Sequence, residues 1–496
     1  MNQTTAATGS GSELFGQPRG LAVLFCTEMW ERFSYYGMRA LLVLFMVDGI
    51  EHGGLGFSDQ TATAIYGLYT AAGYLVSLPG GWIADKLWGA QRSVFVGGFI
   101  IMCGHFVLAI PSVGGFFLGL LLVVLGTGLL KPNASAVVGD LYAPGDARRD
   151  SGFTLFYMGI NVGAFLGPLV CGWLGQWDWH YGFAAAGVGM LAGLVQFRWM
   201  RGWLGTAGSA PLTAPTAKLR FKAWSTIAAA IGGVLLLFGL ALQGAVELDA
   251  LTLAWGTVAV ITVVAVAYFG VLLRWGRLSP EERRRVVVIL ILVFASAIFW
   301  AGYEQAGSAL NLFAQRHTLR DFAGFEIPAS WFQSLNPVFI ILLAPVYSSL
   351  WVRLARRHLE PATPAKFGVG LMILGAGFAV MVGAAALVAG GSQAGPSWLV
   401  ATYLLHTMGE MALSPVGLSA MTKLAPRRWT GQMMGMWFMC MGLGNVGAGL
   451  IAGTFDPAAV GAWPAQYGKI VLAMAGTGAV LLLFTAPLRR LMGGVR

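Results

Sequence analysis

The sequence predicts an all-α polytopic membrane protein with fourteen transmembrane helices, built as two six-helix bundles plus a two-helix insertion. The prediction rests on composition, on long apolar stretches and on the placement of positive charges. Of the 496 residues, 57% are hydrophobic and 10% are charged, whereas soluble chains carry about 25% charged residues. This composition excludes a soluble enzyme and a nucleic-acid binder, so the net charge of +10 is not a nucleic-acid signal.

Fourteen stretches are long enough to cross the hydrocarbon core of a bilayer, which takes about 20 mostly apolar residues in a helix. Continuous runs of this length exclude a β-barrel, whose strands alternate over about ten residues. The predicted spans are 20–47, 59–84, 92–112, 114–141, 151–176, 181–200, 222–245, 251–275, 285–313, 329–354, 366–389, 396–424, 430–454 and 467–490.

Positive charges fix the orientation of these spans. Of the 31 Lys and Arg, 25 fall in the two tails and in the even-numbered connections, and only Arg316, Arg320 and Lys469 fall on the other side. Cytoplasmic loops collect Lys and Arg. Both termini are therefore expected in the cytoplasm.

The domain organisation follows from the spacing of the spans. Residues 1–18 are predicted to be a flexible tail, 19–200 and 284–496 the two six-helix bundles, and 201–283 a cytoplasmic linker with two inserted helices. The linker is rich in Pro, Ala and Thr, as flexible connections often are. Two six-helix halves are typical of transporters that bind substrate near the bilayer midplane.

Seven ionisable residues lie well inside the predicted spans, where each costs about 2.5–3.5 kcal/mol. Together they cost on the order of 20 kcal/mol, too much for side chains that face lipid, so we expect them to pair around a shared aqueous cavity. They are Glu28, Glu31, Arg32, Arg39, Lys131, Glu304 and Glu410.

The first span carries the densest polar stripe. Glu28, Glu31, Arg32, Tyr35, Tyr36 and Arg39 recur at helical spacing on one face. A salt bridge that only staples the bundle is the alternative interpretation of this stripe.

Further polar residues inside the spans extend the predicted cavity. Lys131 precedes Pro132 in the fourth span, and a proline frees backbone carbonyls that can help solvate an ammonium. Trp300 and Trp437 are expected near the cavity, whereas His105 and His406 are expected to pack among apolar residues. The sequence contains no metal-binding HExxH and no nucleotide-phosphate motif on a plausible cytoplasmic face, so no ATP-driven pump or metalloprotease is predicted.

These residues resemble the motifs of one known family. Residues 28–36 match ExxERFxYY and residues 153–163 match FxxFYxxINxG, both typical of the proton-coupled oligopeptide transporters of the major facilitator superfamily. Residues 80–92 resemble the loop motif of that superfamily. Shorter matches surround Lys131, Glu304, Asn336 and Glu410, and the resemblance extends from about residue 19 to 490.

The resemblance implies a major facilitator fold and inward symport of di- and tripeptides with protons, without enzymatic activity. It implies that Arg32 and Lys131 receive the peptide carboxylate and that Glu410 receives the peptide ammonium. The other implied peptide-binding residues are Tyr36, Tyr74, Asn161, Trp300, Asn336, Ser414 and Trp437. Arg39 and Glu304 would form an extracellular gate.

The resemblance further implies a monomer in the bacterial inner membrane, with the lipid bilayer, protons and peptides as partners, no nucleic acid, no metal and no cofactor other than the coupling proton. Proton coupling would involve Glu28, Glu31, Arg32 and Glu304. The second span of this chain has no histidine, unlike mammalian members, so coupling must rest on carboxylates.

Charge counting gives a reason for coupling that does not depend on the resemblance. Four intramembrane acids face three bases, which leaves one negative charge, and an unpaired carboxylate at a site of low dielectric takes up a proton readily. We expect the pair Glu28 and Glu31 to carry that proton. The alternatives are a proton-coupled carrier of nitrate, a carboxylate or a peptide-like drug, and a receptor without flux.

Overall fold

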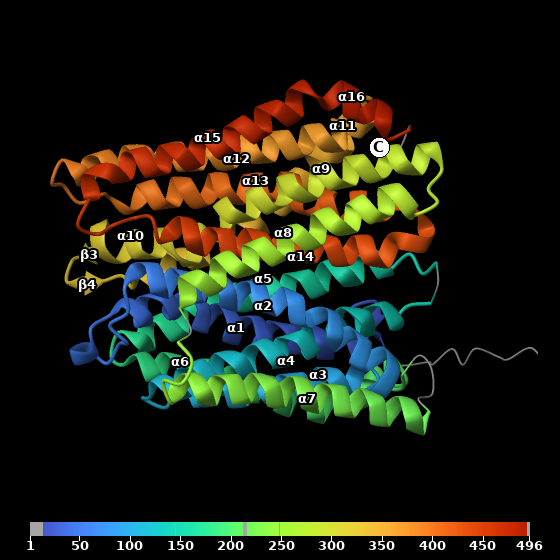
Figure 1. Ribbon diagram of the computed structural model, residues 1–496, viewed down its shortest axis with the longest axis horizontal. Coiled ribbons are helices and arrows are strands. Elements are labelled where there is room, and N and C mark those ends of the chain that lie inside the picture. Colours follow the sequence, from blue (N-terminus) through green and yellow to red (C-terminus); the bar gives the residue numbers. More distant parts are fainter. Residues whose placement is uncertain (1–12, 144, 212–215, 248, 494–496) are drawn as a thin grey trace, which may run out of the picture.

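The computed structural model describes residues 13–143, 145–211, 216–247 and 249–493, which form a bundle of long, roughly parallel helices (Figure 1). The first half of the chain, called the N-half, holds α1 (Gly20–Val47), α2 (Asp59–Ile83), α3 (Ala90–Leu108), α4 (Val113–Asp140), α5 (Arg149–Gly175) and α6 (Trp179–Met200). The inserted helices are α7 (Ala217–Leu242) and α8 (Ala250–Trp275). The C-half holds α9 (Pro280–Tyr303), α10 (Ala309–His317), α11 (Leu335–Arg356), α12 (Thr363–Ala389), α13 (Pro396–Leu424), α14 (Thr430–Ala452), α15 (Trp463–Leu483) and α16 (Thr485–Leu491).

The helices confirm the predicted all-α membrane fold. Within the described part of the chain, 11 segments are long and apolar enough to cross a membrane. The remaining predicted spans are α1, α2 and α13, which are helices of 28, 25 and 29 residues. Polar side chains lower the apolar character of these three helices, and α1 and α13 carry several of the predicted site residues.

The two halves meet along two pairs of helices, α2 with α14 and α5 with α11. Glycines allow the first pair to pack closely. A Cβ atom on Gly449 of α14 would lie 2.2 Å from the Thr63 carbonyl oxygen of α2, so no larger residue fits there. Close packing through small residues is typical of helix contacts in membranes.

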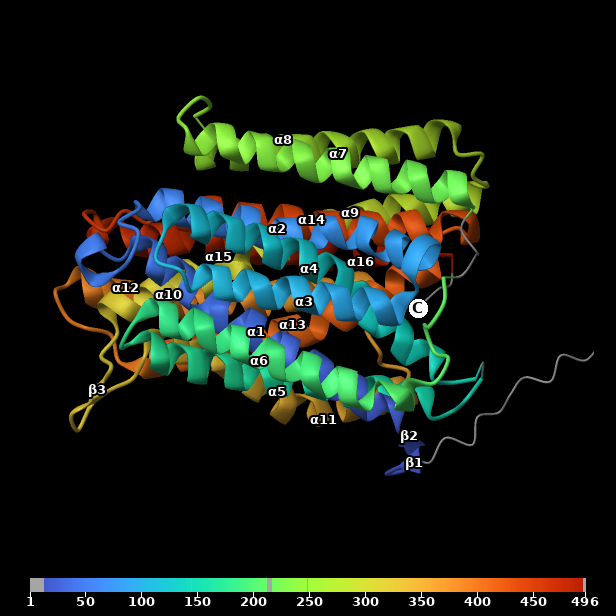
Figure 2. The same cartoon turned by 90° about the horizontal axis from the view of Figure 1, so that it is seen from below.

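The inserted helices form a layer of their own. Figure 2 shows α7 and α8 in one layer, outside the N-half and the C-half. Within that layer the two helices lie apart, because Figure 1 shows α8 over the middle of the bundle and α7 along its lower edge. Of the two, α8 packs against α2 and α14, where the halves meet. The apolar surfaces of α7 and α8 therefore suit contact with lipid, and α8 also packs against one side of the bundle.

The ninth predicted span is not one helix, which corrects the continuous helix expected over 285–313. The α-helix ends at Tyr303, a 3-10 turn covers Glu304–Gly307, and α10 follows from Ala309. At Ser308 the backbone has φ −126° and ψ −97°, outside the helical region. Another 3-10 turn, Ala329–Ser334, precedes α11. Interrupted helices of this kind line binding sites in transporters.

Two short hairpins mark opposite ends of the bundle. Strands β1 (Glu13–Leu14) and β2 (Gln17–Pro18) lie at the end that also holds the C-terminal helix α16, here called the terminal face (Figure 2). Strands β3 (Asp321–Phe322) and β4 (Phe325–Glu326) lie at the other end, here called the hairpin face. Of the predicted flexible tail 1–18, residues 1–12 lie outside the described residues. Residues 13–18 form a β-hairpin.

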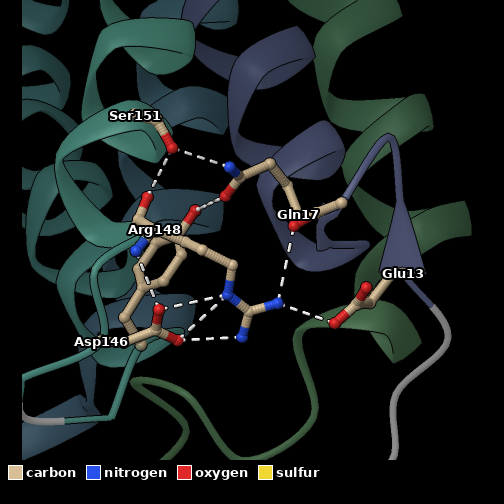
Figure 3. A network of polar contacts seen from close by, with 7 residues as sticks. Glu13, Gln17, Asp146, Arg148 and Ser151 are labelled. Carbon is tan, nitrogen blue, oxygen red and sulfur yellow. Dashed lines mark hydrogen bonds and ion pairs between the residues drawn. The ribbon is translucent and has the colours of Figure 1, made fainter.

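A polar network fixes the β1–β2 hairpin to the start of α5 (Figure 3). The Arg148 guanidinium lies 2.7 Å from a Glu13 carboxylate oxygen and 2.9 Å from an Asp146 carboxylate oxygen. The Gln17 amide donates to the Ser151 hydroxyl at 2.8 Å. Hydrogen bonds from Arg148 lower the pKa of the Asp146 carboxyl, so the ion pair of Asp146 with Arg148 persists at moderately acidic pH.

Candidate functional site: a central polar cavity

A cavity of about 290 Å³ lies between the two halves. The N-half contributes side chains from α1, α2, α4 and α5, and the C-half contributes side chains from α9, α11, α13 and the two 3-10 turns. Most of the predicted site residues line this cavity, namely Glu28, Arg32, Tyr36, Arg39, Tyr74, Lys131, Asn161, Trp300, Glu304, Asn336, Glu410 and Ser414. The structure thus brings together residues that lie up to 386 positions apart in the sequence.

Two predicted site residues lie behind the cavity wall. Glu31 is fully buried and reaches the cavity only through Arg32. Trp437 is also buried, and its ring packs against Phe367 and over Gly417, where a Cβ atom would lie 2.2 Å from the ring. Trp437 therefore supports the C-half wall from behind and does not line it.

On α1, two carboxylates share one guanidinium. The Arg32 Nε atom lies 2.8 Å from Glu28 Oε1 and 2.9 Å from Glu31 Oε2. All three side chains are at most 6% exposed. Glu28 Oε2 and Glu31 Oε1 are buried and have no hydrogen-bond partner among the described residues. This cluster, called the α1 cluster below, therefore has one more negative than positive charge.

The α1 cluster is held in place by close packing with α5. A Cβ atom on Gly163 of α5 would lie 2.1 Å from the Met29 carbonyl oxygen and 2.9 Å from the Arg32 Cβ atom. Only glycine lets α5 approach the charged face of α1 at this point. Asn161, two residues before Gly163 on α5, lies on the cavity wall.

A second cation lies on the N-half wall. The Lys131 ammonium of α4 lies 4.5 Å from the centre of the Tyr74 ring of α2, a distance that allows a cation–π interaction. Next to it, Asn133 donates to the Leu129 carbonyl at 2.6 Å and to the Gly80 carbonyl at 3.3 Å, which ties α4 to α2. Lys131 and Arg32 thus place two cationic groups on the N-half wall.

The C-half wall presents a carboxylate with neutral partners. Glu410 Oε2 of α13 accepts hydrogen bonds from the Tyr303 hydroxyl at 2.5 Å and from the Asn336 amide at 3.1 Å. The Asn336 amide also donates to Thr407 at 3.0 Å, which fixes its orientation. The sequence does not reveal the role of Tyr303, because only the fold brings α9, α11 and α13 together. The sequence signal that could have found it is its place next to Glu304.

Toward the hairpin face, Arg39 and Glu304 join the two halves. The Arg39 guanidinium lies 2.7 Å from Glu304 Oε2, and its Nε atom donates to the Tyr66 hydroxyl at 2.6 Å. Arg39 and Glu304 are at most 8% exposed. Glu304 owes its place to the break after α9, because the 3-10 turn begins at this residue.

Two more contacts between the halves lie on this side of the cavity. Arg316 binds the Asp59 carboxylate through two nitrogens, at 2.6 and 2.9 Å, and the Asn311 amide donates to the Ala40 carbonyl at 2.9 Å. The Arg316–Asp59 pair was not predicted. Its sequence signal is that Arg316 is one of only three Lys and Arg residues that the sequence places on the side opposite the two termini.

His406 was expected to pack among apolar residues, and it does so in part. Its ring centre lies 4.6 Å from that of Phe378 in α12, yet the side chain also borders the cavity. Among the described residues, no cluster of His, Cys, Asp and Glu side chains could hold a metal ion.

Two helical halves, an interrupted helix and a central cavity with charges of both signs define a transporter of the major facilitator type. The model of the POT family matches residues 91–470. The chain is 43% identical to the peptide transporter YePEPT of Yersinia enterocolitica, over 100% of this chain and 99% of that protein. It is 38% identical to a di-/tripeptide transporter of Lactococcus lactis, over 97% and 98% of the two chains.

A solved structure agrees with these similarities. The crystal structure of a mutant peptide transporter in complex with alafosfalin superposes with a TM-score of 0.90, with 42% identity over 98% of each chain. The chain belongs to the POT family, the proton-coupled oligopeptide transporters. It is a transporter and not an enzyme.

Proposed function

We propose that this protein imports di- and tripeptides together with protons, by alternating access of the central cavity to the two sides of the membrane. Membership of the POT family and the names of its relatives support peptide transport. The observation that carries the proposal is the separation of charges, with Arg32 and Lys131 on the N-half wall and Glu410 on the C-half wall. A zwitterionic peptide matches this arrangement at both of its ends.

The peptide ammonium would bind Glu410 and the peptide carboxylate would bind Arg32 and Lys131. Among the described residues, Glu410 has only neutral hydrogen-bond partners, Tyr303 and Asn336, so it can accept a cation without displacing a salt bridge. Asn161 and Asn336 would hydrogen-bond the peptide main chain. The side chains of the bound peptide, which vary in size, would contact Tyr36, Tyr74, Trp300 and Ser414. Trp437 would support this wall from behind.

The proton would bind the α1 cluster. Glu28 and Glu31 compete for Arg32, and protonation of either carboxylate weakens its hold on the guanidinium. Arg32 is then available to the peptide carboxylate, which links the proton to the substrate. Two carboxylates this close titrate as a unit, so the assignment is to the pair.

Alternating access would be controlled by Arg39 and Glu304, as the gate toward the hairpin face. We further propose that residues 19–200 and 284–496 move as two bodies and that residues 201–283 form an appendage. The 25 to 3 distribution of Lys and Arg supports a cytoplasmic terminal face in a bacterial inner membrane. We propose a monomer that uses the proton as its only coupling agent.

The test is uptake of labelled dialanine into proteoliposomes by Glu410→Gln, with and without a proton gradient. Loss of a charge-assisted contact costs roughly 1.5–3 kcal/mol, so peptide affinity should fall about 10- to 150-fold in both driven uptake and counterflow. Glu247→Gln, at an exposed site between α7 and α8, is the matched control. Unchanged affinity in Glu410→Gln would place the ammonium site elsewhere, and uptake that survives a protonophore would contradict symport.

A further inference from the structure

A second hollow, separate from the peptide cavity, opens between α11, α12 and α13 toward the terminal face. Its volume is about 420 Å³. On α11, Ala344, Tyr347 and Trp351 line it at helical spacing, and on α13 Met411, Val416 and Ala420 face them. None of these residues borders the central cavity, so the hollow, called the α11–α13 groove below, is a distinct feature.

The α11–α13 groove has an apolar body and a basic mouth. Lys366, Lys423 and Glu360 line the mouth, where α12 begins and α13 ends. Among the described residues that line the groove, Lys366 and Lys423 are the cations and Glu360 is the acid. Five more cations belong to the neighbouring stretches 353–357 and 489–490 without lining the groove, namely Arg353, Arg356, Arg357, Arg489 and Arg490. An anion is therefore favoured at the mouth, and apolar matter deeper in.

The dimensions of the groove match one leaflet of a bilayer. Met411 and Lys423 are twelve residues apart on α13, which corresponds to about 18 Å of helix. One leaflet contributes about 15 Å of hydrocarbon, half of a core about 30 Å thick. With Lys423 at phosphate depth, an acyl chain would reach the level of Met411.

Lys366 is oriented for an anionic headgroup. Its ammonium lies 4.6 Å from the centre of the Trp351 ring and 2.6 Å from a Glu360 carboxylate oxygen. The Lys366 side chain is only 11% exposed, whereas Glu360 is 39% exposed. The aromatic ring and the carboxylate thus hold the ammonium at the mouth, and the more exposed Glu360 can turn away.

From this geometry we propose that the α11–α13 groove binds an anionic phospholipid of the cytoplasmic leaflet, with its phosphate at Lys366 and Lys423 and one acyl chain along α11 and α13. Basic pockets between transmembrane helices on the cytoplasmic side are suited to anionic lipid headgroups. The proposal rests on the cytoplasmic placement of the terminal face but not on the identity of the transported substrate.

The test is native mass spectrometry of the detergent-purified chain with dioleoylphosphatidylglycerol, compared with the zwitterionic phosphatidylcholine of the same chains. Lys366→Gln should weaken retention of phosphatidylglycerol about 5- to 10-fold, and Glu360→Gln should strengthen it, because the carboxylate no longer competes for the ammonium. Lys222→Gln at the exposed start of α7 is the matched control and should leave retention unchanged. Ala344→Trp should reduce retention by filling the groove.

Other outcomes would overturn the proposal. Equal retention of both lipids, or no response to Lys366→Gln and Glu360→Gln, would remove the headgroup site. Displacement of the lipid by glycerol 1-phosphate at low concentration would indicate a site for a soluble anion. Displacement by dialanine would assign the groove to the peptide route. Because lipid retention is measured without transport, failure of the peptide proposal would leave this result unaffected.

Discussion

The two ion clusters on α1 differ in charge balance and in what they connect. Arg32 shares two carboxylates, Glu28 and Glu31, and all three residues belong to the same helix. Arg39, seven residues further along, has one carboxylate partner, Glu304, which belongs to the opposite half. The first cluster carries an extra negative charge, and the second is balanced.

This difference supports the two separate tasks that we propose for the clusters. A balanced buried pair that spans two bodies must break when they separate, so it can hold a gate closed but gains little from a proton. A cluster with a surplus carboxylate within one helix keeps its geometry as the halves move, and it can change its charge by taking up a proton. Substitutions in the two clusters should therefore affect peptide uptake to different extents.

The largest effect is expected at the balanced pair. Removing one partner of a buried salt bridge leaves an uncompensated charge that costs about 3–5 kcal/mol. Arg39→Gln and Glu304→Gln should each reduce the rate of peptide uptake by at least a hundredfold. The measurement is the initial rate of dialanine uptake in proteoliposomes with equal amounts of inserted protein.

Exchanging the two charges, Arg39→Glu with Glu304→Arg, tests whether the two residues act as one pair or independently. If the residues act as a pair, the double variant should recover part of the activity that each of these single exchanges removes. Losses that simply add would indicate that the two side chains do not depend on each other. The Arg316–Asp59 pair also joins the two halves, but its arginine side chain is 28% exposed. Arg316→Gln should therefore reduce the rate of uptake less than Arg39→Gln does.

The surplus cluster should respond differently. Glu28→Gln and Glu31→Gln should abolish accumulation of peptide against its gradient but retain counterflow, because each removes only the proposed proton site. At 100 mV a transported charge supplies about 2.3 kcal/mol, so the accumulation ratio should drop about 40-fold. Accumulation at the normal ratio in either variant would remove that residue from the coupling mechanism.

The sequence predicted the fold and the cavity well because their signals are local. The predicted first span, 20–47, matches α1, and the stripe of charges on it follows from helical spacing alone. Charges inside apolar spans cannot face lipid, so their convergence on a cavity was predictable without knowing the packing. The cavity lining confirms that convergence for Arg32, Lys131 and Glu410.

Features that depend on tertiary packing could not be predicted. The break at Glu304–Gly307 lies in a segment that is apolar on average, and its stability depends on contacts with other helices, such as the hydrogen bond from the Tyr403 hydroxyl to the Ala306 carbonyl at 3.3 Å. Trp437 has the polarity of a cavity residue, yet its ring packs inside the C-half. Gly417 makes room for the ring there because it has no side chain. Depth along a helix is readable from sequence, but the neighbour that a side chain meets is not.

The smallest effect on the rate of uptake is expected at Tyr66, a neutral residue that contacts the Arg39–Glu304 pair. Its hydroxyl accepts a hydrogen bond from Arg39 Nε at 2.6 Å and lies 3.5 Å from Glu304 Oε2, and its side chain is fully buried. Tyr66→Phe keeps the ring and both charges but removes this contact. A hydrogen bond to a charged group contributes about 1.5 kcal/mol at the low end, so uptake should change about tenfold.

Tyr142→Phe is the matched control for Tyr66→Phe, because the Tyr142 hydroxyl donates to the neutral Gln17 amide at the terminal face, at 2.8 Å. This substitution should change the rate of dialanine uptake less than Tyr66→Phe does. If Tyr66 acts mainly through Arg39, its effect should become smaller in the background of Arg39→Gln, where the hydroxyl keeps only its hydrogen bond to Glu304 at 3.5 Å. An equally large effect of Tyr66→Phe with and without Arg39 would show that the hydroxyl acts through other neighbours. The balanced cluster would then be the Arg39–Glu304 pair alone, and the Tyr66 hydroxyl would act outside it.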